Sequence, residues 1–167
     1  VYSGPNNIII GEIIKASTVQ NIAEFTEANL FKPLGISDYQ WFSKNGIYDV
    51  GGGLKLKSRD IAKYGLLHLN KGKWNDKQIV SSEWMDEIFE PYIEIKHPLY
   101  SCCQWQMVKT EYGFNSWFIP GNGGQIINIV PDLDLVIVIN ADNRKIPKEK
   151  RKPLEFLIKD LTNIHQN

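Results

Sequence analysis

"SWFIPGNGGQIINIVPDLDLVIVIN", residues 116–140, carries the strongest structural signal in the sequence. Two apolar runs flank the four residues Gly121-Asn122-Gly123-Gly124, and this pattern predicts an antiparallel hairpin. Asn-Gly alone can join two strands, because both residues accept the positive φ angles of a tight turn. The additional glycines therefore indicate that another group comes close to the backbone at this turn.

Other strands are predicted around this hairpin. Four segments read as strands joined by short turns: residues 100–108, 114–119, 125–130 and 133–140. Short turns join antiparallel neighbours, so these strands should form a meander. The last of them contains "LVIVI", which is apolar throughout and therefore predicts a central strand that is covered on both faces.

Helices are predicted on both sides of this meander. The first predicted helix runs from Ile8 to Lys15 and is capped by Asn6 or Asn7; the second is opened by a capping box of Asn21 and Glu24 and ends before Pro33. The third runs from Ser58 to Leu69 and is closed by Asn70-Lys71-Gly72. The last two are a helix over residues 83–90, capped by Ser81 or Ser82, and a closing helix over residues 154–164. The fold class is therefore α+β, with helices packed on an antiparallel sheet. Residues 1–99 should be mainly helical, residues 100–140 should form the strands, and residues 148–165 should hold the closing helix.

The composition excludes several classes of function. The chain has 167 residues, and its 19 basic and 19 acidic residues cancel, which does not favour nucleic acid as a partner. No apolar run reaches the roughly 18 residues of a membrane span, and no signal peptide is visible at Val1. The adjacent Cys102 and Cys103 are predicted to be buried structural cysteines, because they lack the spacing of a metal or redox pair. The three histidines are far apart, so no metal site is predicted.

Several stretches together resemble the second half of the serine β-lactamase-related family. They are "VYSGPNNIIIGEIIKAS", "LFKPLGISDYQW", "GGGLKLKSRDIAKYGLLHLNKGKWNDKQIVSSEWM" and "PGNGGQIINIVPDLDLVIVINADN". That family includes class C β-lactamases, D,D-peptidases and esterases of the same fold. The resemblance implies that residues 1–167 form the C-terminal part of one domain with a partial β-lactamase/transpeptidase-like fold, and it implies neither a metal nor an organic cofactor.

The first two motifs of the family carry over only in part. None of the nine serines begins an SxxK sequence, so the family's nucleophile would lie upstream of Val1. "YSG" is similar to the family's Tyr-x-Asn motif, which implies that Tyr2 shuttles protons and that Ser3 and Gly4 line the substrate. Gly4 replaces the asparagine, which puts the amide contact to substrate in doubt. The alternative is that Tyr2 is only an aromatic residue near a helix start.

The third motif matches at Asn122-Gly123-Gly124, beside the substrate-binding strand of the family. The resemblance implies that glycines here let an acyl group approach, and that the N–H of Gln125 contributes to the oxyanion hole. Asn122 replaces the family's cation and carries no charge, which weakens the case for substrates that bear a carboxylate. The alternative is a glycine-rich hairpin without a binding role.

The expected function is that of a serine hydrolase acting on an ester or amide through an acyl-enzyme. Small esters, D-alanyl peptides and β-lactams are all candidate substrates, and this chain alone should be inactive. The rival is a non-catalytic binding module that keeps the fold. Either way, an N-terminal part or another chain is expected to cover the sheet edge, and the family resemblance favours an exported protein.

Overall fold

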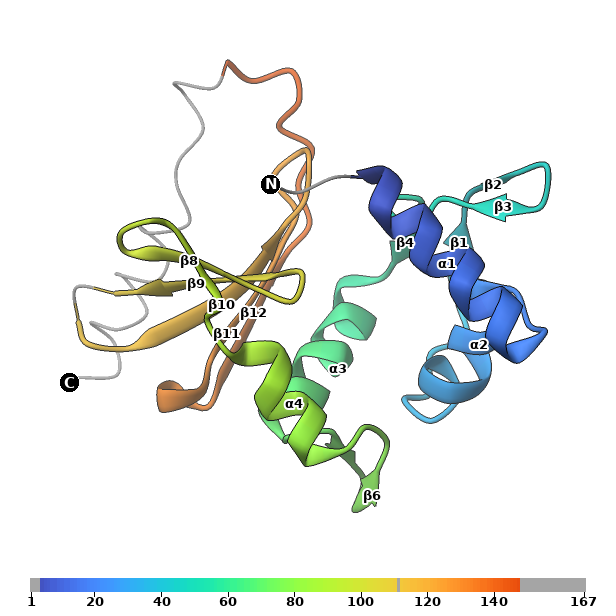
Figure 1. Ribbon diagram of the computed structural model, residues 1–167. Coiled ribbons are helices and arrows are strands. Elements are labelled where there is room, and N and C mark those ends of the chain that lie inside the picture. The colour runs from blue at the N-terminus through green and yellow to red at the C-terminus, as the bar shows by residue number, and fades with distance from the viewer. Residues whose placement is uncertain (1–3, 111, 148–167) are drawn as a thin grey trace. The chain divides into compact units, whose positions relative to one another are not determined.

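The computed structural model describes residues 4–110 and 112–147, which divide into two compact units. One unit spans Val1–Ser81 and the other Ser82–Asn167. Among the described residues, the first unit holds most of the helices, and the second holds a large antiparallel sheet with one helix (Figure 1). The α+β class predicted from the sequence is confirmed.

The first unit contains four helical segments and three small two-stranded antiparallel sheets. The helices are α1 (Gly4–Thr18), α2 (Ile22–Thr26), the π-helix η1 (Glu27–Phe31) and α3 (Ser58–Leu69). The sheets pair β1 (Tyr39–Trp41) with β4 (Leu54–Leu56), β2 (Ser43–Lys44) with β3 (Ile47–Tyr48), and β5 (Lys73–Trp74) with β6 (Lys77–Gln78).

The predicted capping box opens α2. The Asn21 Oδ1 accepts hydrogen bonds from the backbone N–H groups of Ala23 and Glu24, each at 3.0 Å. In return, the Glu24 carboxylate accepts the Asn21 N–H at 3.0 Å. Two otherwise unsatisfied donors at the helix start are thus paired locally, which is why this sequence signal was reliable.

The predicted bounds of α1 were too narrow. The helix begins at Gly4 and not at Ile8, and it runs on to Thr18. Asn7 is therefore a buried residue inside the helix and not its cap. The early start is compatible with Pro5, since the first turn of a helix needs no N–H at that position.

Helix α3 has the predicted bounds and the predicted ending. Lys71 and Gly72 both have left-handed φ angles, of 49° and 81°. The Gly72 N–H donates to the Leu67 carbonyl at 2.7 Å, which satisfies a carbonyl of the last turn. Leu67 and His68 on this helix are buried in the core of the first unit.

The second unit contains α4 (Ser82–Phe89) and one six-stranded antiparallel sheet. The strands are β7 (Ile93–Lys96), β8 (Leu99–Cys102), β9 (Trp105–Lys109), β10 (Asn115–Pro120), β11 (Ile126–Val130) and β12 (Leu135–Ile139). Each strand pairs with the next along the chain, in the order β12-β11-β10-β9-β8-β7. The predicted meander is therefore correct, but the predicted number of four strands is wrong.

Two features account for the extra strands. Residues 100–108 do not form one strand, because Cys103 and Gln104 adopt positive φ angles of 28° and 76° and turn the chain between β8 and β9. β7 and the six short strands of the first unit lie within residues 1–99, which were expected to be mainly helical. Of the two cysteines, Cys102 is buried as predicted, whereas Cys103 lies exposed in this turn.

The prediction that "LVIVI" is a central strand was also wrong. β12 is an edge strand among the described residues, and it pairs only with β11. All five of its residues are half-buried. A wholly apolar strand indicates that both faces are covered, and it carries no information about how many strand neighbours it has. The predicted closing helix, residues 154–164, lies outside the described residues.

The two faces of the sheet differ in chemistry. On one face, the Trp117 Nε1 donates to the Phe89 carbonyl at 3.0 Å, which ties β10 to the end of α4. The Phe89 ring also lies 5.4 Å from that of Trp105 and 5.2 Å from that of Trp117, between ring centroids. On the other face, the Asn128 Nδ2 donates to the Ser116 Oγ at 2.5 Å. Both side chains are fully buried, so this face of the sheet contains a buried polar pair.

Candidate functional site

The candidate site is the turn that joins β10 to β11, residues 121–125. The Gly121 N–H donates to the Gln125 carbonyl at 2.7 Å, and the Gly124 N–H donates to the Gly121 carbonyl at 3.3 Å. Gly123 and Gly124 have φ angles of 142° and 87°, which other residues rarely adopt. The glycines at these two positions are thus required by the backbone itself.

A second segment, residues 141–143, holds this turn in place. It follows β12 and lies beside the turn that closes the β10–β11 hairpin, and we call it the clamp. The Gln125 Nε2 donates to the Ala141 carbonyl at 2.6 Å. The Asn143 N–H donates to the Gly123 carbonyl at 2.8 Å. Two hydrogen bonds between the turn and the clamp therefore hold Gly123 and Gln125 in place.

The glycines also give room to side chains of the chain itself. A Cβ atom on Gly124 would lie 2.5 Å from the Asn143 Nδ2. A Cβ atom on Gly121 would lie 2.8 Å from the Gln125 Oε1. The close approach predicted from the sequence is real, and in this structure the groups that make it are the side chains of Gln125 and Asn143.

The groups of the turn that remain accessible to a ligand are few. The backbone hydrogen bonds of the turn use the Gln125 carbonyl, and among the described residues they do not use the Gln125 N–H. The Asn122 side chain is exposed. A backbone donor held by a fixed turn, beside an exposed amide, is an arrangement that can bind an oxygen atom of a ligand.

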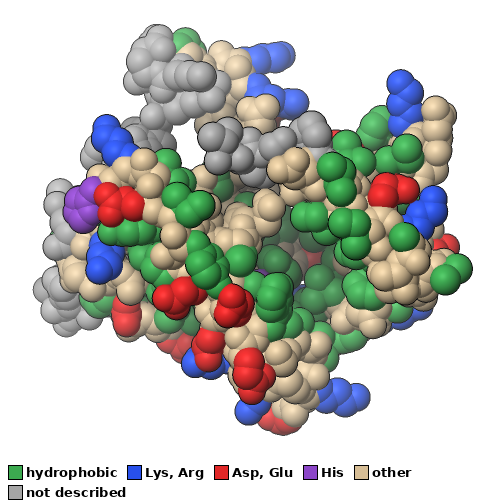
Figure 2. Space-filling view, in the orientation of Figure 1, with side chains coloured by type: hydrophobic (Ala, Val, Ile, Leu, Met, Phe, Trp, Pro, Cys, Tyr) green, Lys and Arg blue, Asp and Glu red, His purple; other side chains and the backbone are tan. Residues whose placement is uncertain are grey.

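Among the described residues, Asp142 and Arg144 form a surface ion pair on either side of Asn143. The Arg144 Nη2 lies 2.7 Å from the Asp142 Oδ2, and its Nε donates to the Asp142 Oδ1 at 2.8 Å. These hydrogen bonds from Arg144 lower the pKa of Asp142 to about 2. The two charges compensate each other, so they add little net field at the turn. More widely, acidic and basic side chains both occur on the face shown in Figure 2.

The described residues show no group of three or more potential metal ligands. Within the same ranges, no helix is both long and apolar enough to cross a membrane.

Comparison with known proteins gives matches among solved structures only; no family model and no curated protein matches the sequence. A Bacillus anthracis protein assigned as a 6-aminohexanoate-dimer hydrolase superposes with a TM-score of 0.77 at 23% sequence identity, over 99% of this chain. An octameric penicillin-binding protein homologue from Pyrococcus abyssi superposes with a TM-score of 0.72 at 16% identity, over 89% of this chain. A D-stereospecific amidohydrolase from Streptomyces sp. gives 0.66 at 15% identity, over 85%. This chain has the fold of serine β-lactamases and penicillin-binding proteins.

The β-lactamase-like fold of these proteins is larger than this chain. The chain spans 42%, 40% and 50% of the lengths of the three structures, respectively. At these identities the likeness shows the fold, and the chemistry has to be argued from the residues of this chain.

The structure brings together four of the seven residues predicted for the site. Asn122, Gly123, Gly124 and Gln125 lie in the turn between β10 and β11. Gly4 is the first residue of α1, in the other unit. Tyr2 and Ser3 lie outside the described residues, so their predicted roles stay predictions.

The clamp was missed at the level of the sequence. The clamp follows from the register of β11 and β12, in which Ile126 pairs with Ile139 and the residues after β12 therefore lie beside Gln125. Sequence patterns predicted each strand by itself. The contact between Asn143 and Gly124 depends on that pairing, which has to be known first.

Proposed function

We propose that this chain is the C-terminal part of a serine hydrolase, in which the turn at residues 121–125 binds the carbonyl oxygen of an ester or amide. The observation that carries the proposal is the Gln125 N–H, which the turn holds in place and does not use for its own hydrogen bonds. In the family that the sequence resembles, a backbone N–H at this position donates to the oxyanion.

The energetic value of such a donor comes from its fixed position. When an acyl group is attacked, negative charge develops on its oxygen, and a donor that is already in place stabilises this charge without reorganisation. A single donor of this kind contributes about 3 kcal/mol to the transition state. The clamp supplies the rigidity, because it fixes Gly123 and Gln125 by hydrogen bonds of 2.8 and 2.6 Å.

The exposed Asn122 favours a neutral substrate at this strand. A cation at this position would form an ion pair with a substrate carboxylate, whereas the Asn122 amide carries no charge and can only donate or accept a hydrogen bond. We therefore favour a small ester or amide over a β-lactam or D-alanyl peptide.

The remaining chemistry is assigned by resemblance. A serine in an SxxK sequence outside this chain would attack the carbonyl carbon and form the acyl-enzyme. Tyr2 would accept the serine proton and pass it to the leaving group, while Ser3 and Gly4 would line the substrate. No cofactor is required for this reaction, and an exported location is the one that the family resemblance favours.

The missing SxxK serine is one reason to expect more polypeptide beside this chain, and the half-buried edge strand β12 is a second. Its five residues are all apolar, and an exposed apolar edge strand is a template for aggregation. We propose that another stretch of polypeptide, from the same protein or from a partner, covers this edge.

The alternative function is a binding module that keeps the β-lactamase-like fold without catalysis. The lack of an SxxK serine in this chain, Gly4 and Asn122 all favour it. Under this alternative, the turn binds a carbonyl group and no covalent bond forms.

The experiment that separates these functions uses the longest open reading frame that contains this sequence. The purified product is incubated with a fluorophosphonate probe, and the labelled residue is located by mass spectrometry. Stoichiometric labelling of a serine in an SxxK sequence is the expected result, together with hydrolysis of p-nitrophenyl esters by a separate, unlabelled sample that prior labelling abolishes. A product that binds ligand but shows neither labelling nor hydrolysis would establish the binding module.

A further inference from the structure

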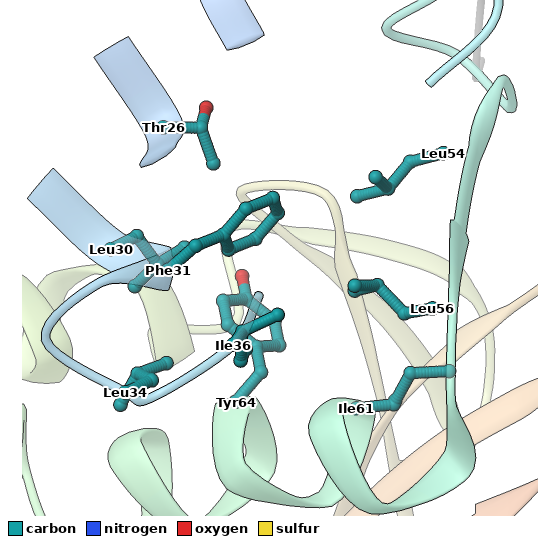
Figure 3. A pocket seen from close by; sticks show the side chains of 9 residues that line it. All are labelled: Thr26, Leu30, Phe31, Leu34, Ile36, Leu54, Leu56, Ile61 and Tyr64. Atoms are coloured by element: carbon teal, nitrogen blue, oxygen red, sulfur yellow. The ribbon is translucent and has the colours of Figure 1, made fainter. Parts of the chain in front are cut away.

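The first unit contains an apolar cavity that the proposed function does not use. Its volume is about 220 Å³. It lies between the α2–η1 helical segment, strand β4 and helix α3 (Figure 3). Nine residues line it: Thr26, Leu30, Phe31, Leu34, Ile36, Leu54, Leu56, Ile61 and Tyr64.

The cavity has a deep floor and a half-exposed wall. Phe31, Leu34 and Ile36 form the floor, and they are only 2%, 1% and 3% exposed. Leu54 and Leu56 on β4 are half-buried and extend towards Phe31 in Figure 3. Apolar side chains thus border the space from both sides, and the half-exposed wall gives a ligand a route of entry.

The polar content of the lining is small. None of the nine residues is charged. Thr26 turns its methyl group towards the Phe31 ring and its hydroxyl away from it (Figure 3). Burial raises the pKa of the Tyr64 hydroxyl to about 12, so this group stays neutral. Such a lining offers nothing to an ion, because a charge that enters it loses its hydration without gaining a partner.

We propose that this cavity binds a small, neutral, apolar molecule that presents an aromatic ring or a branched alkyl group. Apolar cavities of about 150 Å³ in proteins stay dry and take up benzene, and the larger volume here fits a ring with one to three additional carbons. The space is open to solvent on one side, so binding removes apolar surface of both the ligand and the lining residues from water. The proposal is independent of the hydrolase proposal, since none of the nine residues that line the cavity belongs to the proposed hydrolase site.

Toluene is the probe, and benzoate is the charged control of similar size. In a titration followed by methyl NMR, toluene should cause saturable shifts of the methyl groups of Ile36, Leu56 and Ile61. It should also raise the melting temperature, because a ligand that binds only the folded state stabilises it. Benzoate should do neither.

A pair of Leu→Phe variants tests the location. Leu54→Phe adds volume at the wall of the cavity and should weaken toluene binding by about tenfold or more, since the ring competes for the same space. Leu66→Phe is the matched control: Leu66 lies on α3, is exposed and does not line the cavity, so its affinity for toluene should match that of the unsubstituted chain. Three results would overturn the proposal: shifts that do not saturate, equal binding of benzoate, or shifts centred on residues outside the cavity. All three are measured on the unsubstituted chain, so the test does not depend on the folding of Leu54→Phe.

Discussion

Replacing Gly124 by alanine should destabilise the second unit by about 1.5–3.5 kcal/mol, and the structure divides this cost into two parts. The first part is conformational. Gly124 has a φ angle of 87°, where an L-residue with a Cβ atom costs about 1–2 kcal/mol. The second part is steric, because the new Cβ atom would lie 2.5 Å from the Asn143 Nδ2 and 2.9 Å from its Cγ. If the Asn143 side chain rotates away into a poor rotamer, it adds about 0.5–1.5 kcal/mol.

Gly113→Ala is the matched control for the conformational part. Gly113 lies in the same unit and has a φ angle of 86°, but a Cβ atom there would meet nothing within 4 Å. This variant should therefore cost only the first part, about 1–2 kcal/mol. The difference between the two glycines measures the contact between the turn and the clamp. Adding Asn143→Ala to Gly124→Ala should remove most of that difference, because the atoms that collide are then absent.

The assay is urea unfolding followed by tryptophan fluorescence, with the free energy of unfolding taken from the transition that reports Trp105 and Trp117. The two units can unfold separately, so each transition has to be fitted by itself. The reasoning is refuted if Gly124→Ala is no more destabilising than Gly113→Ala, or if Asn143→Ala leaves their difference unchanged. Either result would mean that the clamp does not pack on the turn.

Three further predictions follow from other parts of the chain. Burial lowers the pKa of His68 below its usual 6.5, so the unfolded chain binds a proton more readily. The first unit should therefore be most stable above about pH 6.5 and lose stability as the pH falls towards the lower folded pKa, as urea midpoints against pH would show; His68→Gln should flatten this dependence. The isolated 167-residue chain should hydrolyse neither nitrocefin nor p-nitrophenyl esters, and stoichiometric fluorophosphonate labelling of any of its nine serines would contradict this. In a polypeptide that also carries the nucleophile, Tyr2→Phe should lower kcat by about 10²–10⁴-fold, whereas Asn122→Ala should mainly raise KM; wild-type rates for Tyr2→Phe would remove that residue from the mechanism.

Local signals in the sequence were sufficient where the stabilising interaction is itself local. The Asn21–Glu24 capping box closes within four residues, and the left-handed Lys71-Gly72 ending of α3 closes within the six residues from Leu67 to Gly72. The β10–β11 hairpin also follows from its own residues, because glycines fill the positions with φ angles of 142° and 87°. In each case the residue type reports the backbone conformation directly.

Local signals failed where the backbone adopts a conformation that its residues do not favour. Cys103 and Gln104 turn the chain between β8 and β9 with positive φ angles, although neither is a typical turn residue. The pairing of β8 with β9 on both sides of them fixes this turn. The turn therefore depends on the pairing of two strands, and the residue types of 100–108 alone do not predict it.

For the candidate site, the glycines predicted a turn, and the structure has this turn between β10 and β11. The binding roles of Asn122, Gly123, Gly124 and Gln125 stay predictions. The clamp was not predictable from a motif. Ala141 and Asn143 reach the turn only because β12 pairs with β11 in one particular register.

The role of the Gln125 N–H is the central claim, and an amide-to-ester substitution tests it most directly. Replacing the residue at position 125 by its α-hydroxy acid analogue, in a polypeptide that carries the SxxK serine, exchanges the N–H for an oxygen and keeps the side chain. Because the described residues provide no acceptor for this N–H within the turn, the free energy of unfolding should stay within about 0.5 kcal/mol of the unsubstituted protein. The rate of acylation, measured by stopped-flow burst kinetics with a p-nitrophenyl ester, should fall by about 10²–10³-fold. An unchanged acylation rate in a protein of unchanged stability would show that this N–H does not bind the oxyanion.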